Sequence, residues 1–422
     1  MTMKKKIFAI FGPLVLSAVL VAILFFTPFN IDLDSKKVLA DASTSMSANI
    51  LRGNAIKNKA ISSDKYVPFF GSSELSRISA FHPSVLAEKY DRNYRPFLLG
   101  APGTQSLTQA MMMKSMGSDL ANKKVVFILS PQWFVKEGVT KDYFNAYYSE
   151  LQTYQWVKNL EEIDESDKYL ANRLLDFSKV REDKLLVRAL KNIENGQQPK
   201  KSDKQSIRLK LSMLSREDGL FSKIGMINKQ KAIDKATKKL PEKYDYQVLD
   251  TLAGEIGKKA TSNNSFEISN RFYNKRLKNK LTKLENSQKD WNYCFSPEYS
   301  DLQLALNQLA KEKTEVMFII PPVNKHWSNF TGLSQEMLQG YAKKVKYQLE
   351  SQGFTNIADF TTADNVSYFM ADTIHLGWRG WLNVDQKIQP FLEGNTKNNT
   401  HYKMNDSFYS KEWQEKDPQE IQ

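Results

Sequence analysis

Apolar and polar stretches alternate along the chain in a way that predicts strands and helices. Predicted strands occupy residues 66–70, 95–99, 124–129, 314–320 and 355–360, and within them residues 125–129 and 316–320 are continuously apolar. Runs of this length without polar alternation are typical of strands buried on both faces of a parallel sheet. Apolar residues at helical spacing lie between them, at 106–120, 299–313, 334–352 and 377–392. Strands that alternate with helices predict an α/β fold with a parallel five-stranded sheet flanked by helices.

The alternation is interrupted by a long charged segment, residues 140–295. It is rich in lysine, poor in glycine and has the spacing of amphipathic helices. We predict a large helical insertion, and it stays open whether the insertion packs on the sheet or forms a subdomain. Its lysines are read either as solvated helix faces or as a surface for an anionic polymer. The predicted organisation is a cytoplasmic start and anchor at 1–30, a stalk or lead-in at 31–63, a core formed by 64–139 and 296–395, the insertion at 140–295, and a C-terminal tail at 396–422.

The N-terminus has the pattern of a membrane anchor. Three lysines at residues 4–6 precede an uncharged apolar run at 7–29. A helix needs about 20 apolar residues to cross a bilayer, whereas a cleavable signal peptide has a shorter apolar core and a small-residue cleavage site. We therefore predict an uncleaved transmembrane helix in the cytoplasmic membrane. Lysines before the run, and Asp32 and Asp34 after it, predict a cytoplasmic N-terminus and an extracellular main body.

Composition narrows the classes of partner and site. The formal net charge is +13, which favours a polyanion such as nucleic acid or teichoic acid, or an anionic membrane surface. A body outside the cell does not meet nucleic acid, so no nucleic-acid partner is predicted. The single cysteine, Cys294, excludes an intrachain disulfide and argues against a cysteine-based metal site. We predict neither a metal nor a cofactor.

Candidate chemistry follows the ends of the predicted strands. In chain order these features are Gly71-Ser72-Ser73, Gly103, Gln132, Pro321-Pro322, and Asp372 with His375. The carboxyl ends of parallel strands meet at one edge of a sheet, where sites form in α/β folds. We therefore predict that these five features converge on one site.

The pair Asp372 and His375 has the spacing of a catalytic carboxylate and imidazole. A carboxylate that orients an imidazole next to a hydroxyl activates that hydroxyl as a nucleophile. Gly71 permits the sharp turn that exposes such a hydroxyl, although Gly-Ser-Ser is also an ordinary strand-to-helix turn with a serine cap. The three other histidines, His82, His326 and His401, are interpreted as structural.

These motifs resemble those of the SGNH hydrolase superfamily. The usual Gly-Asp-Ser is Gly71-Ser72-Ser73 here, and the usual Asn is matched by Gln132 in Ser-Pro-Gln-Trp. Matching the tripeptide makes Ser73 the nucleophile, but Ser72 occupies the Asp position. Which of the two hydroxyls reacts therefore stays open.

A fuller resemblance covers nearly the whole chain. The anchor and four motifs resemble the DltD family of D-alanyl-lipoteichoic acid biosynthesis proteins of Gram-positive bacteria. The motifs are Phe-Phe-Gly-Ser-Ser-Glu-Leu at 69–75, Leu-Gly-Ala-Pro-Gly-Thr-Gln-Ser at 99–106, Ser-Pro-Gln-Trp-Phe at 130–134 and Asp-x-x-His-Leu-Gly-Trp at 372–378. The resemblance implies an extracytoplasmic acyl transfer in the D-alanylation of (lipo)teichoic acid. It also implies a membrane-bound O-acyltransferase and other D-alanylation proteins as partners.

The resemblance further implies the role of each residue. Ser73 would carry the D-alanyl group, His375 would be the general base, and Asp372 would orient the imidazole. Backbone N–H groups of Ser73 and Gly103, with the Gln132 amide, would bind the oxyanion.

Other residues near the motifs have two interpretations. Trp133, Trp378 and Trp381 would either exclude water from the site or pack in the core. Lys325 and His326 are candidate contacts to polymer phosphate. Two other functions stay open: a surface esterase or thioesterase with the same triad, and a non-catalytic, membrane-tethered scaffold of the pathway.

Overall fold

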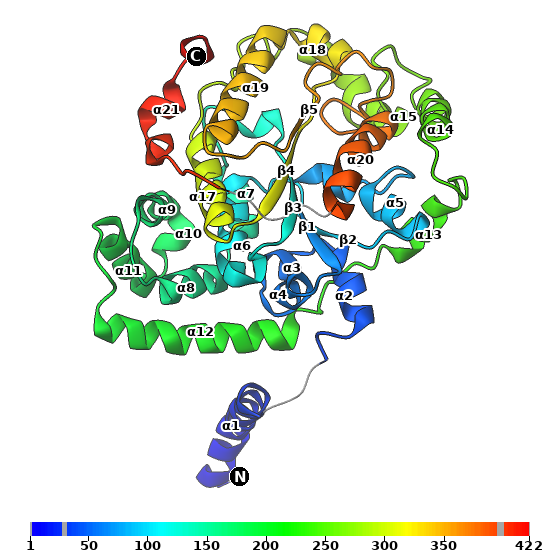
Figure 1. Ribbon diagram of the computed structural model, residues 1–422. Coiled ribbons are helices and arrows are strands. Elements are labelled where there is room, and N and C mark those ends of the chain that lie inside the picture. Colours follow the sequence, from blue (N-terminus) through cyan, green and yellow to red (C-terminus); the bar gives the residue numbers. More distant parts are fainter. Residues whose placement is uncertain (1, 28–31, 395–400, 422) are drawn as a thin grey trace.

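The computed structural model describes residues 2–27, 32–394 and 401–421. Its centre is a parallel sheet of five strands in the order β2-β1-β3-β4-β5 (Figure 1). The strands are β1 (Tyr66–Phe70), β2 (Arg95–Leu99), β3 (Lys124–Ile128), β4 (Glu315–Ile320) and β5 (Ile357–Asp359). The first two match the predicted runs residue for residue, and the others agree within two residues. The predicted α/β class and parallel five-stranded sheet are confirmed.

The strand order puts β1 at a topological switch point. β1 pairs with β2 on one side, from Tyr66↔Arg95 to Phe70↔Leu99, and with β3 on the other. The chain therefore leaves β1 in one direction and returns to its opposite edge, as in flavodoxin-like sheets, where ligands bind at the carboxyl ends of the strands beside this reversal. The loop after β1 has this position.

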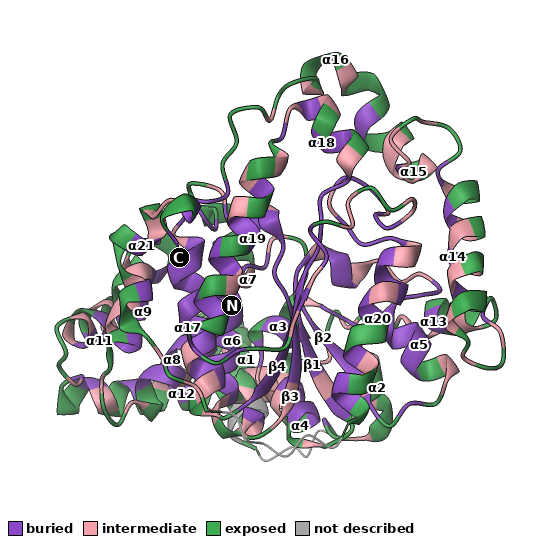
Figure 2. Ribbon diagram, turned by 45° about the horizontal axis from the view of Figure 1, so that its top comes forward, coloured by how far each residue is buried: buried purple, intermediate pink, exposed green. Residues whose placement is uncertain are grey.

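Helices cover both faces of the sheet. In Figures 1 and 2, α6, α17 and α19 lie on one face and α5 and α20 on the other, with buried residues facing inward. Their bounds are α5 (Pro83–Lys89), α6 (Ser106–Met116), α17 (Glu298–Lys311), α19 (Gln335–Glu350) and α20 (Trp378–Glu393). Predicted helix 106–120 continues beyond α6 as a 3-10 helix, Gly117–Leu120. Gly117, at the end of α6, has a positive φ of 50°, which an α-helix does not accommodate.

The insertion wraps around both helical layers. Its helices are α7 (Lys141–Tyr147), α8 (Glu150–Asn159), α9 (Glu165–Leu175), α10 (Ser178–Arg181), α11 (Lys184–Glu194), α12 (Lys201–Phe221), α13 (Gln230–Thr237), α14 (Tyr246–Ala260), α15 (Asn270–Phe272) and α16 (Leu281–Leu284). α8 packs on α6, whereas α13 packs on α5 and α14 on α20. Leu170, Leu186 and Leu249 of the insertion join the main hydrophobic core. The insertion is therefore packed on the α/β core along much of its length.

The N-terminal segments differ in how they pack. Helix α1 (Met3–Phe26) covers most of the predicted anchor, and residues 28 and 29 of that run lie outside the described residues. In the described part of the chain, no helix has the length and apolarity required of a membrane span. The predicted transmembrane helix is thus not confirmed. The lead-in forms α2 (Lys36–Ser43), α3 (Ala48–Arg52) and α4 (Ala55–Ser62), which bury Leu51 and Ile61 in the core.

The described part of the C-terminal tail, residues 401–421, also packs on the core. It contains α21 (Lys411–Glu415), whose Trp413 is buried and donates from Nε1 to Gln348 Oε1 at 3.1 Å. Buried Lys344 of α19 donates to the carbonyl oxygens of Gln414 at 3.1 Å and Lys416 at 2.9 Å. This segment therefore extends the layer formed by α17 and α19.

Candidate active site

The turn after β1 is held by groups from the loop after β2 and from the first turn of α6. The Gly71 carbonyl accepts hydrogen bonds from Thr104 Oγ1 at 2.7 Å and from Gln109 Nε2 at 2.6 Å. A Cβ at Gly100 would overlap the same carbonyl, so only glycine allows this close approach of the two strand ends. The chain then enters a 3-10 helix, Ser73–Ser76, with Ser73 as its first residue.

Ser73, His375 and Asp372 form a continuous hydrogen-bonded chain. Ser73 Oγ lies 2.6 Å from His375 Nε2, and His375 Nδ1 lies 2.8 Å from Asp372 Oδ1. Ser73 is half-buried, while His375 and Asp372 are buried. The imidazole can therefore accept the hydroxyl proton at Nε2, because its own proton lies on Nδ1 and is donated to Asp372. This is the arrangement that activates a serine for nucleophilic attack.

The backbone around Asp372 fixes the spacing of the pair. Asp372 Oδ1 accepts the N–H groups of Ile374 and His375, each at 3.1 Å. The Ala371 N–H donates to the His375 carbonyl at 2.8 Å, closing a tight turn just before α20. Asp and Asn favour such turns because the side chain bonds the backbone two residues on. The Asp-x-x-His spacing thus places both side chains on one turn, as the sequence predicted.

A cation not identified from the sequence faces the carboxylate of this pair. Arg77 Nη1 donates to Asp372 Oδ2 and forms an ion pair with it. Burial raises the pKa of Asp372, but the hydrogen bond from His375 and the positive charge of Arg77 outweigh it. The net effect holds the pKa below the usual value of 3.8. Asp372 therefore stays ionised and can stabilise a protonated imidazole.

The two adjacent serines have different environments. Ser72 is buried, and its Oγ donates to the Ala101 carbonyl at 3.1 Å and accepts the Gly103 N–H at 3.2 Å. Ser73 Oγ instead faces the imidazole. The geometry therefore favours Ser73 as the reactive hydroxyl and assigns Ser72 to support of the turn.

The predicted oxyanion donors are only partly free. Ser73 is the first residue of its 3-10 helix, and the first N–H groups of a helix have no partner within the helix. The Gly103 N–H is engaged with Ser72 Oγ, which differs from the predicted free donor. Gly103 has a φ of +94° and a Cβ there would overlap the Tyr143 ring, so the position requires glycine. Gln132 is half-buried, and within the described residues its Oε1 is buried without a hydrogen-bond partner.

The predicted substrate-binding residues have mixed surroundings. Trp133 and Trp381 belong to the main hydrophobic core, at 2% and 1% exposure, whereas Trp378 is half-buried at the start of α20. Core packing therefore accounts for Trp133 and Trp381. Lys325 Nζ lies 3.7 Å from Asp364 Oδ2, and His326 is exposed. Phosphate contact by Lys325 and His326 stays a prediction.

His82 has a structural environment. It is buried, its Nδ1 accepts the Ser84 N–H at 3.2 Å, and its ring lies 5.3 Å from the Trp381 ring. Burial lowers the pKa of His82 to about 3, so its imidazole is neutral. The structural interpretation of His82 is confirmed.

A second buried carboxylate supports the nucleophile turn. Glu74 Oε1 accepts the Ser72 N–H at 2.7 Å, and burial raises the pKa of Glu74. Glu74 and Arg77 were not predicted as site residues. Their only signal in the sequence is position, because they lie one and four residues after Ser73.

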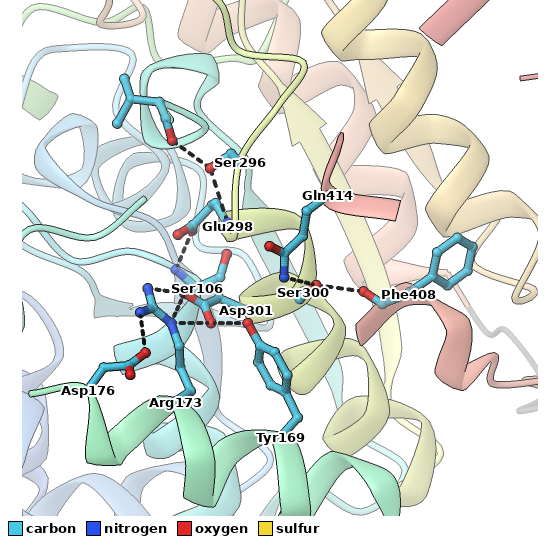
Figure 3. Close-up of polar contacts among 11 residues, drawn as sticks. Ser106, Tyr169, Arg173, Asp176, Ser296, Glu298, Ser300, Asp301, Phe408 and Gln414 are labelled. Carbon is cyan, nitrogen blue, oxygen red and sulfur yellow. Dashed lines mark hydrogen bonds and ion pairs between the residues drawn. The ribbon is translucent and has the colours of Figure 1, made fainter. Parts of the chain in front are cut away.

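A buried polar cluster lies behind the loop that leads from Gly103 into α6. Glu298 Oε1 accepts the Ser106 N–H at 2.7 Å and caps the first turn of α6 (Figure 3). Glu298 and Asp301 both lie on α17. Asp301 accepts hydrogen bonds from Tyr169 at 3.0 Å and from Arg173 at 3.2 Å, and both of these residues belong to the insertion. The insertion is thereby tied to the helix that supports the site loop.

Comparisons with known proteins identify the family of the chain. The family model described as DltD protein matches residues 43–393. A Protein DltD from Lacticaseibacillus rhamnosus is 48% identical over 407 residues, covering 96% of this chain and 95% of the relative. One from Bacillus subtilis (strain 168) is 34% identical, covering 93% and 98%. One from Staphylococcus aureus (strain NCTC 8325 / PS 47) is 30% identical, covering 85% and 89%. The chain belongs to the DltD family.

Proposed function

We propose that this protein is a serine-dependent O-acyltransferase that transfers D-alanine to (lipo)teichoic acid outside the cytoplasmic membrane. Its family is involved in the D-alanylation of teichoic acid. The observation that carries the proposal is the hydrogen-bonded chain from Ser73 Oγ through His375 to Asp372, at 2.6 and 2.8 Å. The expected SGNH-like character of the fold has the support of the strand order and of this triad at the sheet edge.

The first half-reaction loads the enzyme. His375 Nε2 takes the proton from Ser73 Oγ as the oxygen attacks the D-alanyl carbonyl carbon. The bond to the donor's leaving group then breaks, and that group receives the proton from His375. Asp372 keeps the imidazole oriented through Nδ1 and stabilises its positive charge. The product is a D-alanyl ester on Ser73.

The second half-reaction delivers the acyl group. His375 Nε2 takes the proton from a hydroxyl of the polymer, whose oxygen attacks the Ser73 ester. Ser73 Oγ leaves and recovers the proton from His375, which restores the enzyme. N–H groups at Ser73 and Gly103, with the Gln132 amide, are the proposed oxyanion donors; the Gly103 N–H would have to be released by Ser72 Oγ.

The proposal includes a location and partners. α1 exposes apolar side chains such as Phe8, Leu14 and Leu20, which supports its role as an anchor in the cytoplasmic membrane. The body would then face outward, where a membrane-bound O-acyltransferase and other D-alanylation proteins would supply the acyl group.

The test uses cells that lack their own copy of the gene. We expect Ser73→Ala and His375→Ala to abolish D-alanine esters on teichoic acid, and Ser72→Ala to retain a reduced amount. Mass spectrometry after a serine-reactive probe should find the adduct on Ser73. Wild-type ester content in both Ser73→Ala and His375→Ala would exclude the enzyme and favour a scaffold. In a separate assay, acylated polymer is supplied to the purified extracellular body of the protein. Rapid release of free D-alanine there would favour an esterase.

A further inference from the structure

A basic pocket lies beside the triad, and apart from Arg77 its lining residues have no role in the acyl-transfer chemistry described above. Its volume is about 460 Å³. The lining residues are Arg77, Ser269, Arg271, Phe272, Lys275 and Arg276. Four of the six carry a positive charge and none carries a negative one. A concave surface with this lining favours an anion.

Three of the four cations are free of carboxylate partners. Among the described residues, Arg271, Lys275 and Arg276 form no ion pair, and all three are exposed. Arg77 is partly neutralised by Asp372. A concave surface lined by charges of one sign concentrates counter-ions. Three uncompensated charges on one small pocket therefore leave room for a ligand that brings its own negative charge.

The pocket is connected to the catalytic turn at two points. Arg77 follows the 3-10 helix that begins at Ser73, and its guanidinium contacts both Asp372 and the pocket. The Ser269 N–H donates to the Ala371 carbonyl at 2.9 Å, one residue before Asp372. A ligand in the pocket is therefore held next to the residues that orient His375.

The insertion segment that forms the pocket wall has its own support. Ile268 and Leu277 are buried with Trp327 of α18 (Lys325–Thr331) in a small hydrophobic cluster. Phe272 packs on this cluster, and the Arg77 guanidinium lies 5.4 Å from the Phe272 ring centroid. Lys275 and Arg276 lie in a short π-helix, Tyr273–Leu277, a rare conformation that is frequent at functional sites.

We propose that this pocket binds a phosphodiester group of the acceptor polymer and so positions the neighbouring hydroxyl for attack on the Ser73 ester. The proposal rests on the proposed function for the identity of the polymer. Arginine suits this ligand because its planar fork of N–H donors matches two phosphate oxygens. In a phosphodiester repeat, the phosphate and the hydroxyl that is acylated are separate groups of one repeat unit. This explains why the pocket lies beside the triad and not at it.

The test measures binding of a soluble diester, glycerophosphoglycerol, to the full-length protein in detergent. The pocket variant is Arg271→Gln with Arg276→Gln, which leaves Arg77 and the triad intact. The matched control is Lys278→Gln with Lys280→Gln, which removes the same charge from exposed positions of the adjoining turn outside the pocket. We expect the pocket variant to raise Kd by about a hundredfold, since it removes two charge-assisted contacts and each costs about a factor of ten. The control should stay within about twofold.

Three further readouts make the result decisive. The pocket variant should keep the rate of Ser73 labelling by a small neutral serine-reactive probe, which shows that the fold and triad are intact. Equal diester binding by wild type and pocket variant, or an equal loss in the control, would overturn the proposal. Variant-sensitive binding to phosphatidylglycerol vesicles without binding of the soluble diester would assign the pocket to a lipid head group instead. If Ser73 is never acylated but the pocket still discriminates the diester, the proposed function fails and the anion site stands.

Discussion

Arg77 stands out among the single residues because it has two neighbours of different kinds. Its guanidinium pairs with buried Asp372 on one side and lines the basic pocket on the other. The pairing stabilises the ionised form of Asp372, whose pKa lies below its usual value. An anion bound in the pocket would contact the same guanidinium that pairs with Asp372. Arg77 therefore links ligand binding to the carboxylate that orients the imidazole.

The prediction at this scale concerns Arg77→Met, which keeps the apolar stem and removes the charge. Burial then opposes ionisation of Asp372 with one fewer counter-charge, so the pKa of Asp372 rises. A protonated Asp372 no longer stabilises the positive charge that His375 acquires when it takes the Ser73 proton, so labelling of Ser73 falls as pH drops through the pKa of Asp372. The acid limb of Ser73 labelling, measured with a neutral probe, should therefore move to higher pH in Arg77→Met.

Arg271→Gln is the matched control, because Arg271 lines the same pocket and forms no ion pair with Asp372. Its acid limb should coincide with that of wild type. An unshifted acid limb in Arg77→Met would show that Arg77 does not hold Asp372 ionised.

Among the elements, the strands were the most predictable from the sequence. β1 and β2 are buried on both faces, so their residues form continuous apolar runs that end at Gly71 and Gly100. Asp372 and His375 were also predictable, because a three-residue spacing fits one turn. The contact of Arg77 with Asp372 was not, because it joins residues 295 positions apart and leaves no periodic pattern. The hydrogen bond from Gly103 to Ser72 was missed because it too leaves no periodic pattern. The Glu74 contact to the Ser72 N–H is local, but a glutamate beside a turn has no spacing that marks it as buried.

The helix pair α6 and α17 carries a prediction about pH. Burial raises the pKa of Glu298 to about 8, and nearby Asp301 adds to this effect. An unfolded Glu has a pKa near 4.5, so between about pH 4.5 and 8 the folded state holds the extra proton. Stability is therefore greatest below the unfolded pKa and falls as pH rises through the folded pKa. Each pKa unit corresponds to about 1.4 kcal/mol.

Glu298→Gln should remove this part of the decline. The amide oxygen can still accept the Ser106 N–H, and the side chain no longer ionises. Urea denaturation at pH 5, 7 and 9 should show the variant losing less stability than wild type over that range, by at least about 1 kcal/mol. Exposed Glu350→Gln, at the end of α19, is the control and should follow wild type. An identical decline in Glu298→Gln and wild type would mean that Glu298 is ionised in the folded state.

On the scale of the whole molecule, two distant parts of the sequence form one sheet and the insertion encloses them. Residues of β1 to β3 precede the insertion, and those of β4 and β5 follow it. The insertion returns to the sheet edge near Ser269, where it supplies most of the basic pocket. The sequence predicted an insertion and its positive charge. The sequence did not predict the path of the insertion around the core. Amphipathic spacing indicates that one face of a helix is buried, but it does not indicate which other element covers that face.

The N-terminal helix gives the prediction for the intact protein. Within the described residues the buried core begins at Leu33, whereas α1 exposes Phe8, Leu16 and Ile23. Exposed apolar side chains of this number are costly in water and are accommodated in a lipid bilayer. The full chain should therefore sediment with membranes and resist extraction at high pH, whereas a chain that begins at Asp32 should stay in the supernatant. Both should keep Ser73 labelling, because α1 contributes nothing to the described core. Recovery of the full chain in the supernatant would refute the anchor and, with it, the proposed extracytoplasmic orientation.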